Sequence, residues 1–263
     1  MSITLRNLIF CGVFQDLDKP CRSAFMKFLF GYLLLLVPAA SAQDFSCPAG
    51  QADVMKYFVM NEERRASQFL DGKPNPIYTQ VFPDSDFASR GYWFWLKSPK
   101  AHGFDVKAFD EKYVYMRSTE LTWKDNTSFK RFEHDLPVAA RCVPEGEAGP
   151  EIKVRDTKFV YFSSCRAYKS SDLGTAVNEI DAPRQMDLGG NTGQAWTRVL
   201  HYHYNCDKNY RNCRDEEQFY LANGYGLWRW KHYKNDELVK TASMNDIQRG
   251  GPNATLPCTE SYR

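Results

Sequence analysis

The chain has 263 residues, of which 34 are basic, 32 are acidic and 15% are aromatic, and its formal net charge at pH 7 is +2. Residues 1–42 hold four of the basic and two of the acidic side chains, so the remaining 221 residues carry 30 of each. A charge balanced this closely excludes strong non-specific attraction to nucleic acid or to an anionic membrane surface.

The first predicted element is a secretory signal peptide. Met26 and Lys27 precede the apolar run Phe28–Pro38, and Ala40 and Ala42 occupy the key positions of a small-residue cleavage site. The apolar run is too short to span a bilayer, which needs about 20 such residues. We therefore predict that translation starts at Met26 and that cleavage after Ala42 releases a secreted or periplasmic product of residues 43–263, without a membrane span.

A helix is expected next, over residues 51–70. Helical spacing relates the apolar residues of this segment, which are Val54, Met55, Phe58, Val59, Ala66, Phe69 and Leu70. Such spacing predicts one amphipathic helix, and Asp71-Gly72 followed by two prolines predicts its end.

From residue 77 onward the sequence changes to short runs rich in β-branched and aromatic residues, separated by turn-forming clusters. The expected strands are 77–82, 92–97, 113–117, 120–123, 158–163, 196–204, 227–233 and 238–242. A helical turn is expected at 171–179, and a hairpin connection at 234–237. This pattern predicts a mainly β protein, an antiparallel β-sandwich or jelly-roll-like fold.

Residues 142–151, CVPEGEAGPE, form the clearest break in composition. They are either a linker between two smaller units or a long surface loop within one β-rich domain of residues 43–263. The sequence leaves both alternatives open.

Six cysteines follow the predicted cleavage site, an even number that in an exported chain is typical of disulfides. Cys206 and Cys213 bound a short polar segment whose two ends can meet, so we predict a local bridge there. The other four are assigned as Cys47–Cys142 and Cys165–Cys258, one of several connectivities that the spacing allows.

The richest stretch for function is residues 196–233, which hold three of the six tryptophans and three of the five histidines. Alternation along its two strand-like runs places large aromatics on both faces of a sheet, whereas a core needs only one such face. An exposed aromatic face is typical of a binding site, and sugar rings stack on Trp and Tyr. The predicted ligand-binding residues are Tyr202, Tyr204, Trp228, Trp230, His201 and His203.

The same stretch contains histidines at spacings that occur in metal sites. His201 and His203 project from one face of a strand, and His232 on another strand is a conceivable third ligand. No acidic residue alternates with them along the strand. We therefore expect no metal and no cofactor.

Two further functional interpretations stay open. On the same scaffold, a polysaccharide lyase or glycoside hydrolase would use the catalytic set Tyr202, His203, Arg198, His232 and Glu217, with Glu216 as an alternative carboxylate. A purely structural envelope protein would use none of them. The favoured prediction is an exported, disulfide-stabilised β-protein that binds a glycan or another envelope polymer, and the sequence leaves its oligomeric state open.

Overall fold

The computed structural model describes residues 45–58, 65–70, 76–83, 91–96, 104–118, 128–189, 192–249 and 258. For residues 65–70, 76–83, 91–96, 104–107, 118 and 244–249 the description is of the backbone alone. All of these residues belong to one compact unit, Asp44–Arg263. The predicted signal peptide lies outside them.

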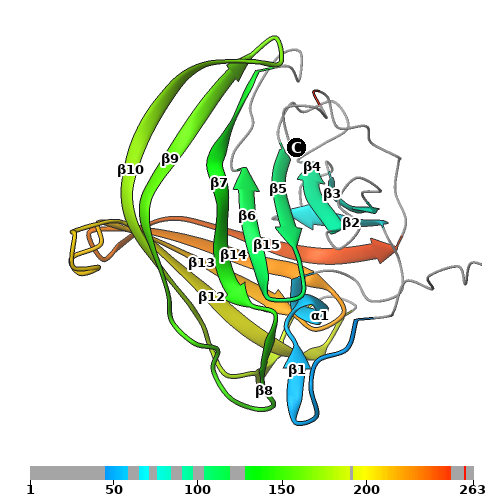
Figure 1. Cartoon of the computed structure of the whole chain (residues 1–263). Helices are drawn as coiled ribbons and strands as arrows, with labels where there is room; N and C mark the ends of the chain where they lie inside the picture. The colour runs from blue at the N-terminus through cyan, green and yellow to red at the C-terminus, as the bar shows by residue number, and fades with distance from the viewer. Residues whose placement is uncertain are drawn as a thin grey trace, which may run out of the picture. The chain divides into compact units, whose positions relative to one another are not determined.

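Within the described residues, thirteen strands form one antiparallel sheet (Figure 1). Its order is β10 (Arg166–Ile180), β9 (Ile152–Ser163), β7 (Phe129–Ala140), β6 (Tyr113–Ser118), β5 (Phe104–Phe109), β4 (Gly91–Leu96), β3 (Pro76–Pro83), β2 (Arg65–Leu70), β15 (Glu237–Arg249), β14 (Gly226–Lys234), β13 (Asp215–Ala222), β12 (Gln194–Cys206) and β11 (Arg184–Asp187). Strand β10 also pairs with β12, so the sheet closes on itself. A separate pair joins β1 (Gln51–Asp53) to β8 (Cys142–Pro144).

The predicted class, mainly β with antiparallel strands, is confirmed. Neighbours in the sheet are for the most part consecutive in the chain, which is the order of a meander rather than of a jelly roll with crossing connections. The arrangement is consistent with a β-sandwich, and β10 and β7, which flank β9 in the sheet, are also in direct contact. The side-chain amide of Asn178 on β10 donates to the carbonyl oxygen of Pro137 on β7 at 3.0 Å.

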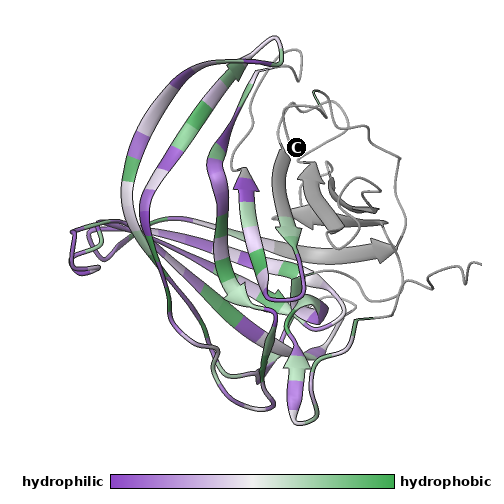
Figure 2. Ribbon diagram, viewed as in Figure 1, coloured by the Kyte–Doolittle hydropathy of each residue, from purple (hydrophilic) through white to green (hydrophobic). Residues whose placement is uncertain are grey.

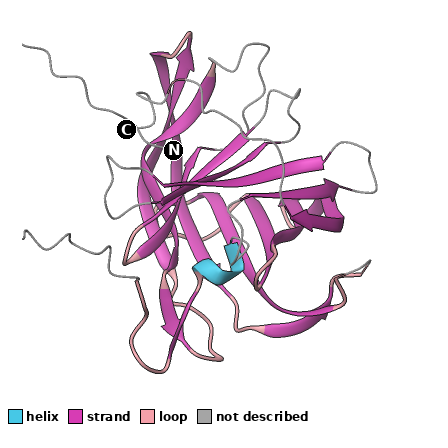
Figure 3. Cartoon of the chain, turned by 90° about the vertical axis from the view of Figure 1, so that its right-hand side faces the viewer, coloured by secondary structure: helices cyan, strands magenta, loops and turns pink. Residues whose placement is uncertain are grey.

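The predicted helix over residues 51–70 is wrong in its extent. Helix α1 covers only Met55–Phe58, a single turn visible in Figure 3, and it is preceded by β1 and followed by β2. Its Met55, Tyr57 and Phe58 are buried and only Lys56 is exposed, so this one turn packs mainly into the core. Residues 65–70 instead pair with β15 and β3, and this tertiary pairing overrides the local apolar spacing. Residues 59–64 lie outside the described residues.

Two other local predictions need correction. Residues 171–179, expected as a helical turn, belong to the long strand β10, where they pair with β9 on one side and β12 on the other. Strand β13 was not predicted, because its first residues are acidic and polar and resemble a loop. The predicted strand 120–123 lies outside the described residues.

Two-residue turns shape both long hairpins. Ser164 and Cys165 connect β9 to β10, and Asn235 and Asp236 connect β14 to β15, all four with positive φ. Two consecutive residues of positive φ match the twist of antiparallel strands, and Asn and Asp adopt this conformation more readily than most residues. The predicted pairing of 227–233 with 238–242 is confirmed, with a turn shorter than expected.

The strands β12, β13 and β14 have a core face and an outer face, because side chains alternate across a strand. Hydrophilic and hydrophobic residues both occur along the strands of the sheet (Figure 2). On β12 the core face carries Arg198, Leu200, Tyr202 and Tyr204. Arg198 lies 5.3 Å from the ring centroid of Tyr57 on α1, which covers this face. The outer face of β12 carries the intervening odd-numbered residues; it is buried as far as residue 199 and half-buried at 201 and 203.

All three predicted disulfides are confirmed within the described part of the chain: Cys47–Cys142, Cys165–Cys258 and Cys206–Cys213. Cys142 begins β8, so the segment 142–151 starts with a short strand and continues as a turn. The protein is thus a disulfide-stabilised β-protein.

The disulfides should differ in their contribution to stability. Cys47–Cys142 spans 95 residues and Cys206–Cys213 spans seven. In the chain-entropy model, a loop near 100 residues contributes about 4.7 kcal/mol and one of eight residues about 2.5 kcal/mol. Replacing both cysteines of the first bridge by Ala should therefore lower the free energy of unfolding about 2 kcal/mol more than the same change at the second. Urea unfolding measures both, and an equal or reversed loss would contradict the model.

Candidate functional site

One group of side chains, here called the aromatic–carboxylate cluster, lies on the core face close to the 206–213 loop. It consists of Tyr204, Asp215, Glu217, Trp230 and His232. Glu217 accepts hydrogen bonds from the Tyr204 hydroxyl at 3.3 Å and from the Trp230 indole at 2.8 Å. Nε2 of His232 lies 3.3 Å from the Tyr204 hydroxyl and 3.5 Å from an Asp215 carboxylate oxygen. All but Asp215 are half-buried, so rings and a carboxylate reach solvent together.

Hydrogen bonds link the side chains of the cluster. The Tyr204 hydroxyl donates to Glu217. When Nε2 of His232 carries the ring proton, that nitrogen can donate to the Tyr204 oxygen or to Asp215. The carboxylate of Glu217, which Tyr204 and Trp230 both contact, lies at the centre of the cluster.

Asp215 anchors the end of the cluster next to the disulfide loop. Its carboxylate accepts hydrogen bonds from Asn205 at 2.6 Å and from Arg214 at 3.3 Å. Burial alone would raise the pKa of Asp215, but hydrogen bonds from Asn205, Arg214 and His232 outweigh it and hold the pKa below its ordinary value. The cluster therefore carries negative charge on its β13 side at neutral pH.

Tyr202 lies one step deeper on the same face. It is 4% exposed, and its ring stacks on that of Tyr204 with centroids 4.8 Å apart. Burial raises the pKa of Tyr202 well above its ordinary value, and the nearby Glu217 raises it further. A phenol held protonated in this way is poorly suited to abstract a proton from a substrate.

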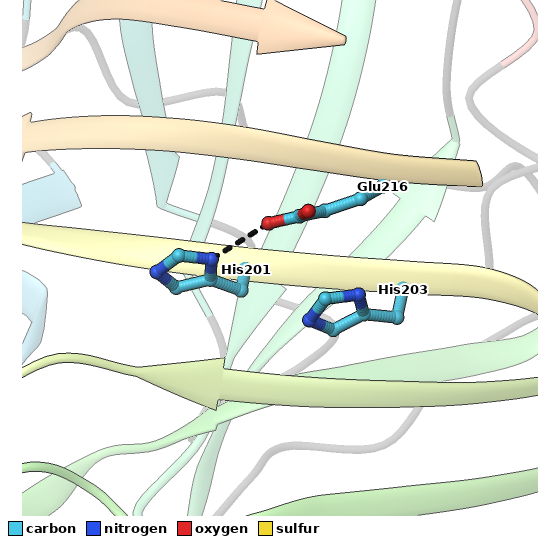
Figure 4. Close-up of side chains that lie close together, drawn as sticks. All are labelled: His201, His203 and Glu216. Atoms are coloured by element: carbon cyan, nitrogen blue, oxygen red, sulfur yellow. Dashed lines mark hydrogen bonds and ion pairs between the residues drawn. The ribbon is translucent and has the colours of Figure 1, made fainter. Parts of the chain in front are cut away.

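A second group, the histidine–glutamate cluster of His201, His203 and Glu216, lies on the outer face (Figure 4). The two imidazole rings are nearly parallel, with centroids 6.1 Å apart. Glu216 stands directly opposite His203 across the β12–β13 ladder, and its carboxylate lies 2.8 Å from Nδ1 of His201. One ligand atom from each of the three residues lies within 4.8 Å of the other two.

A hydrogen-bonded chain holds Glu216 in place. Gln218 donates to the Glu216 carboxylate at 2.8 Å, and the Tyr220 hydroxyl donates to Gln218 at 3.0 Å. Burial alone would raise the pKa of Glu216, but hydrogen bonds from His201 and Gln218 outweigh it and hold the pKa below its ordinary value. Glu216 is therefore ionised at neutral pH.

The structure separates the residues that the sequence grouped together. Of the six predicted ligand-binding residues, Tyr204 and Trp230 meet in the aromatic–carboxylate cluster, while His201 and His203 lie on the opposite face. Tyr202 and Trp228 are buried, so neither presents a ring to solvent.

The predicted catalytic set is divided in the same way. Glu217 and His232 come together, but His203 points to the other face. Arg198 is fully buried, and its guanidinium donates to the carbonyl oxygens of Glu147 and Asp181 at 2.7 and 2.8 Å. In this position Arg198 links two backbone segments, and its guanidinium is not accessible to a substrate carboxylate.

Sequence reasoning missed Asp215 and the pairing of Glu216 with the two histidines. A signal for both was present in the predicted Cys206–Cys213 bridge. If Cys206 and Cys213 are opposite each other on two antiparallel strands, the residue three positions before Cys206 is opposite the residue three positions after Cys213. His203 is then opposite Glu216. The observed ladder has this register throughout.

No helix in the described part of the chain is long and apolar enough to cross a membrane.

Arg198 should matter for stability. Arg198→Met keeps much of the side-chain length but removes two hydrogen bonds from a fully buried guanidinium to the carbonyl groups of Glu147 and Asp181, so the free energy of unfolding should fall by about 2–5 kcal/mol. Arg166→Met, at an exposed position on β10, should change it by about 0.5 kcal/mol or less. Urea unfolding compares the two, and an unchanged stability in Arg198→Met would refute the structural role.

Comparison with known proteins leaves the function open. No protein-family model and no curated protein sequence matches the chain. Among solved structures it is similar to a Bacteroides fragilis protein described as exported and as having a YmcC-like fold, with 11% sequence identity and a TM-score of 0.40. The match covers 73% of this chain and 99% of that one. A likeness this distant assigns no function, which must be argued from the two clusters themselves.

Proposed function

We propose that the chain is an exported glycan-binding protein and that the aromatic–carboxylate cluster is its binding site. The observation that carries the proposal is the convergence of the half-buried rings of Tyr204, Trp230 and His232 on the carboxylate of Glu217. Export is supported by the leader-like segment that ends at Ala42 and by three disulfides, which persist in oxidising compartments.

The chemistry of the cluster suits a sugar. The C–H face of a pyranose ring packs against an aromatic ring, and its hydroxyl groups donate to carboxylate oxygens. Glu217 already accepts two hydrogen bonds from Tyr204 and Trp230, so its oxygens are oriented before a ligand arrives. A small number of oriented polar groups among apolar surface is the usual composition of a small-molecule site.

The two carboxylates of the cluster, Glu217 and Asp215, disfavour an acidic ligand. Glu217 and Asp215 lie on the same face of β13, and a uronic-acid polymer would bring a third carboxylate to them. Like charges at such a distance repel in a partly buried site. The expected ligand is therefore a neutral or amino-sugar glycan.

Lys240 on β15 lies over the Trp230 ring, so a sugar that stacks on this ring would displace it. Its Nζ lies 5.4 Å from the ring centroid of Trp230, and the residue is exposed. A cation over an exposed ring contributes only about 0.5–1 kcal/mol. A sugar ring can displace it at small cost.

The lyase alternative loses its support in this geometry. It requires a cation for the substrate carboxylate and a tyrosine able to lose its proton, but Arg198 is fully buried and the pKa of Tyr202 is raised. A glycoside hydrolase acting through Glu217 differs from a binding protein in releasing reducing sugar, so incubation with a bound neutral glycan separates the two.

Loss of either exposed ring should weaken binding. Trp230→Ala and Tyr204→Ala should each reduce retention of the protein on an immobilised neutral polysaccharide about tenfold, equivalent to about 1.4 kcal/mol. Affinity electrophoresis against neutral, amino-sugar and uronic-acid polysaccharides measures this. Wild type should be retarded by the first or second class and not by the third.

Trp196→Ala and Tyr168→Ala are matched controls, since both side chains are at least half exposed and lie outside the cluster. Their retention should equal that of wild type. Thermal unfolding of every variant separates lost binding from lost folding. If no polysaccharide retards the wild type, or if the control substitutions weaken retention as much as Trp230→Ala does, the proposed site is wrong.

A further inference from the structure

We propose that His201, His203 and Glu216 form a binding site for a divalent transition metal on the outer face of the sheet, separate from the glycan site. The ligand types are those of zinc: two imidazoles and a carboxylate complete a three-residue set and leave a fourth position for water or an exchangeable ligand. The sequence analysis considered His201 and His203 as metal ligands but did not include Glu216, because this acidic residue comes from a strand that was not predicted.

The spacing of the three groups fits a single ion. Ligands about 2.0–2.1 Å from a tetrahedral zinc ion lie roughly 3.3 Å from one another. Here one ligand atom from each residue lies within 4.8 Å of the others, and Nδ1 of His201 is already 2.8 Å from Glu216. Rotation of the side chains alone is therefore enough to close around an ion, and no strand has to move.

The backbone fixes the three positions more firmly than a loop would. His201 and His203 are alternate residues of one strand, and Glu216 is directly opposite His203 on the next strand of the same ladder. Cys206–Cys213 closes the loop between these strands. Sites on paired strands hold their ligands with little freedom, which lowers the entropy lost on binding.

A supporting shell is also present. Gln218 donates to Glu216, and Tyr220 donates to Gln218, so the carboxylate is oriented by neighbours, as in metal sites whose outer partners fix the ligands. Asp181 lies 3.4 Å from Nε2 of His201 and can hold that nitrogen while Nδ1 faces the ion. Among the described residues, neither ring nitrogen of His203 has a hydrogen-bond partner, so that imidazole is free to coordinate.

The chemistry also predicts selectivity. Imidazole nitrogen favours zinc, cobalt, nickel and copper, whereas magnesium and calcium prefer sites made of oxygen alone. Zn²⁺ and Co²⁺ should therefore bind with one ion per chain, and an excess of Mg²⁺ or Ca²⁺ should not displace them.

The test uses residues 43–263 without a polyhistidine tag, titrated with Co²⁺ and followed by its visible absorption, then with Zn²⁺ in competition. Wild type should give a saturable tetrahedral cobalt spectrum that stoichiometric Zn²⁺ removes. His203→Gln should weaken Co²⁺ binding at least tenfold and abolish the tetrahedral spectrum. Gln218→Ala should leave the spectrum in place with an affinity about 10–100-fold lower.

A histidine outside both clusters supplies the control. His134→Gln, at an exposed position on β7, should bind Co²⁺ as wild type does. Circular dichroism and thermal unfolding confirm that each variant is folded, and Glu216→Gln serves as a second ligand variant if His203→Gln fails to fold. The proposal is overturned if wild type shows no saturable binding, if both ligand variants bind as wild type does, or if His134→Gln lowers affinity equally.

Discussion

The register between β12 and β13 determines which side chains meet in this protein. The ladder runs without a bulge from Thr197 opposite Ala222 to Tyr204 opposite Asp215. Because side chains alternate across a strand, this one register places Glu216 among the histidines and Glu217 among the aromatic rings. A slip of one residue would exchange the two faces of one strand and break both clusters at once. The bridge Cys206–Cys213 lies at the end of this ladder and excludes such a slip.

Consecutive residues of β12 therefore point their side chains to opposite faces of the sheet. His201 and His203 reach the outer face, while Tyr202 and Tyr204 reach the core face, within one short segment of chain. The backbone hydrogen bonds of β10 and β13 hold this segment on both sides. The two clusters share the paired strands β12 and β13 but no side chain.

The sequence was sufficient for the class of fold and for the local bridge Cys206–Cys213, because strand-like alternation and a short polar loop between two cysteines are local signals. The even cysteine count indicated that the other four cysteines pair, but it did not select Cys47–Cys142 and Cys165–Cys258 among the possible connectivities. The sequence was insufficient where pairing partners are distant. The helix expected over residues 51–70 gave way to β2, whose partner β15 lies at the other end of the chain. β13 went unnoticed because Asp215, Glu216 and Glu217 resemble a loop until β12 and β14 are placed beside them.

The candidate residues show the same limit. Composition correctly drew attention to residues 196–233, but it could not say that Arg198 and Tyr202 would be buried while Tyr204 and Trp230 stay half-buried. Arg198, for example, lies against the ring of Tyr57 on α1, a segment more than 100 residues away in the sequence. Whether a side chain of β12 is buried depends on which distant segments pack on it, and the sequence of β12 alone does not contain this information.

The pairing of β2 with β15 joins two segments far apart in the sequence, which limits how much of the sheet can form while the chain is being synthesised. Ala66 pairs with Arg249, 183 residues later, and at about 5–20 residues per second synthesis of the intervening chain takes roughly 10–40 s. Hairpins such as β9–β10 and β14–β15 need only neighbouring residues and can form as they emerge. Until β15 has been synthesised, the edge of β2 that will pair with it has no partner. An unpaired strand edge can pair with a strand of another chain. Protection of that edge until residue 249 has been made is thus a requirement of the fold itself.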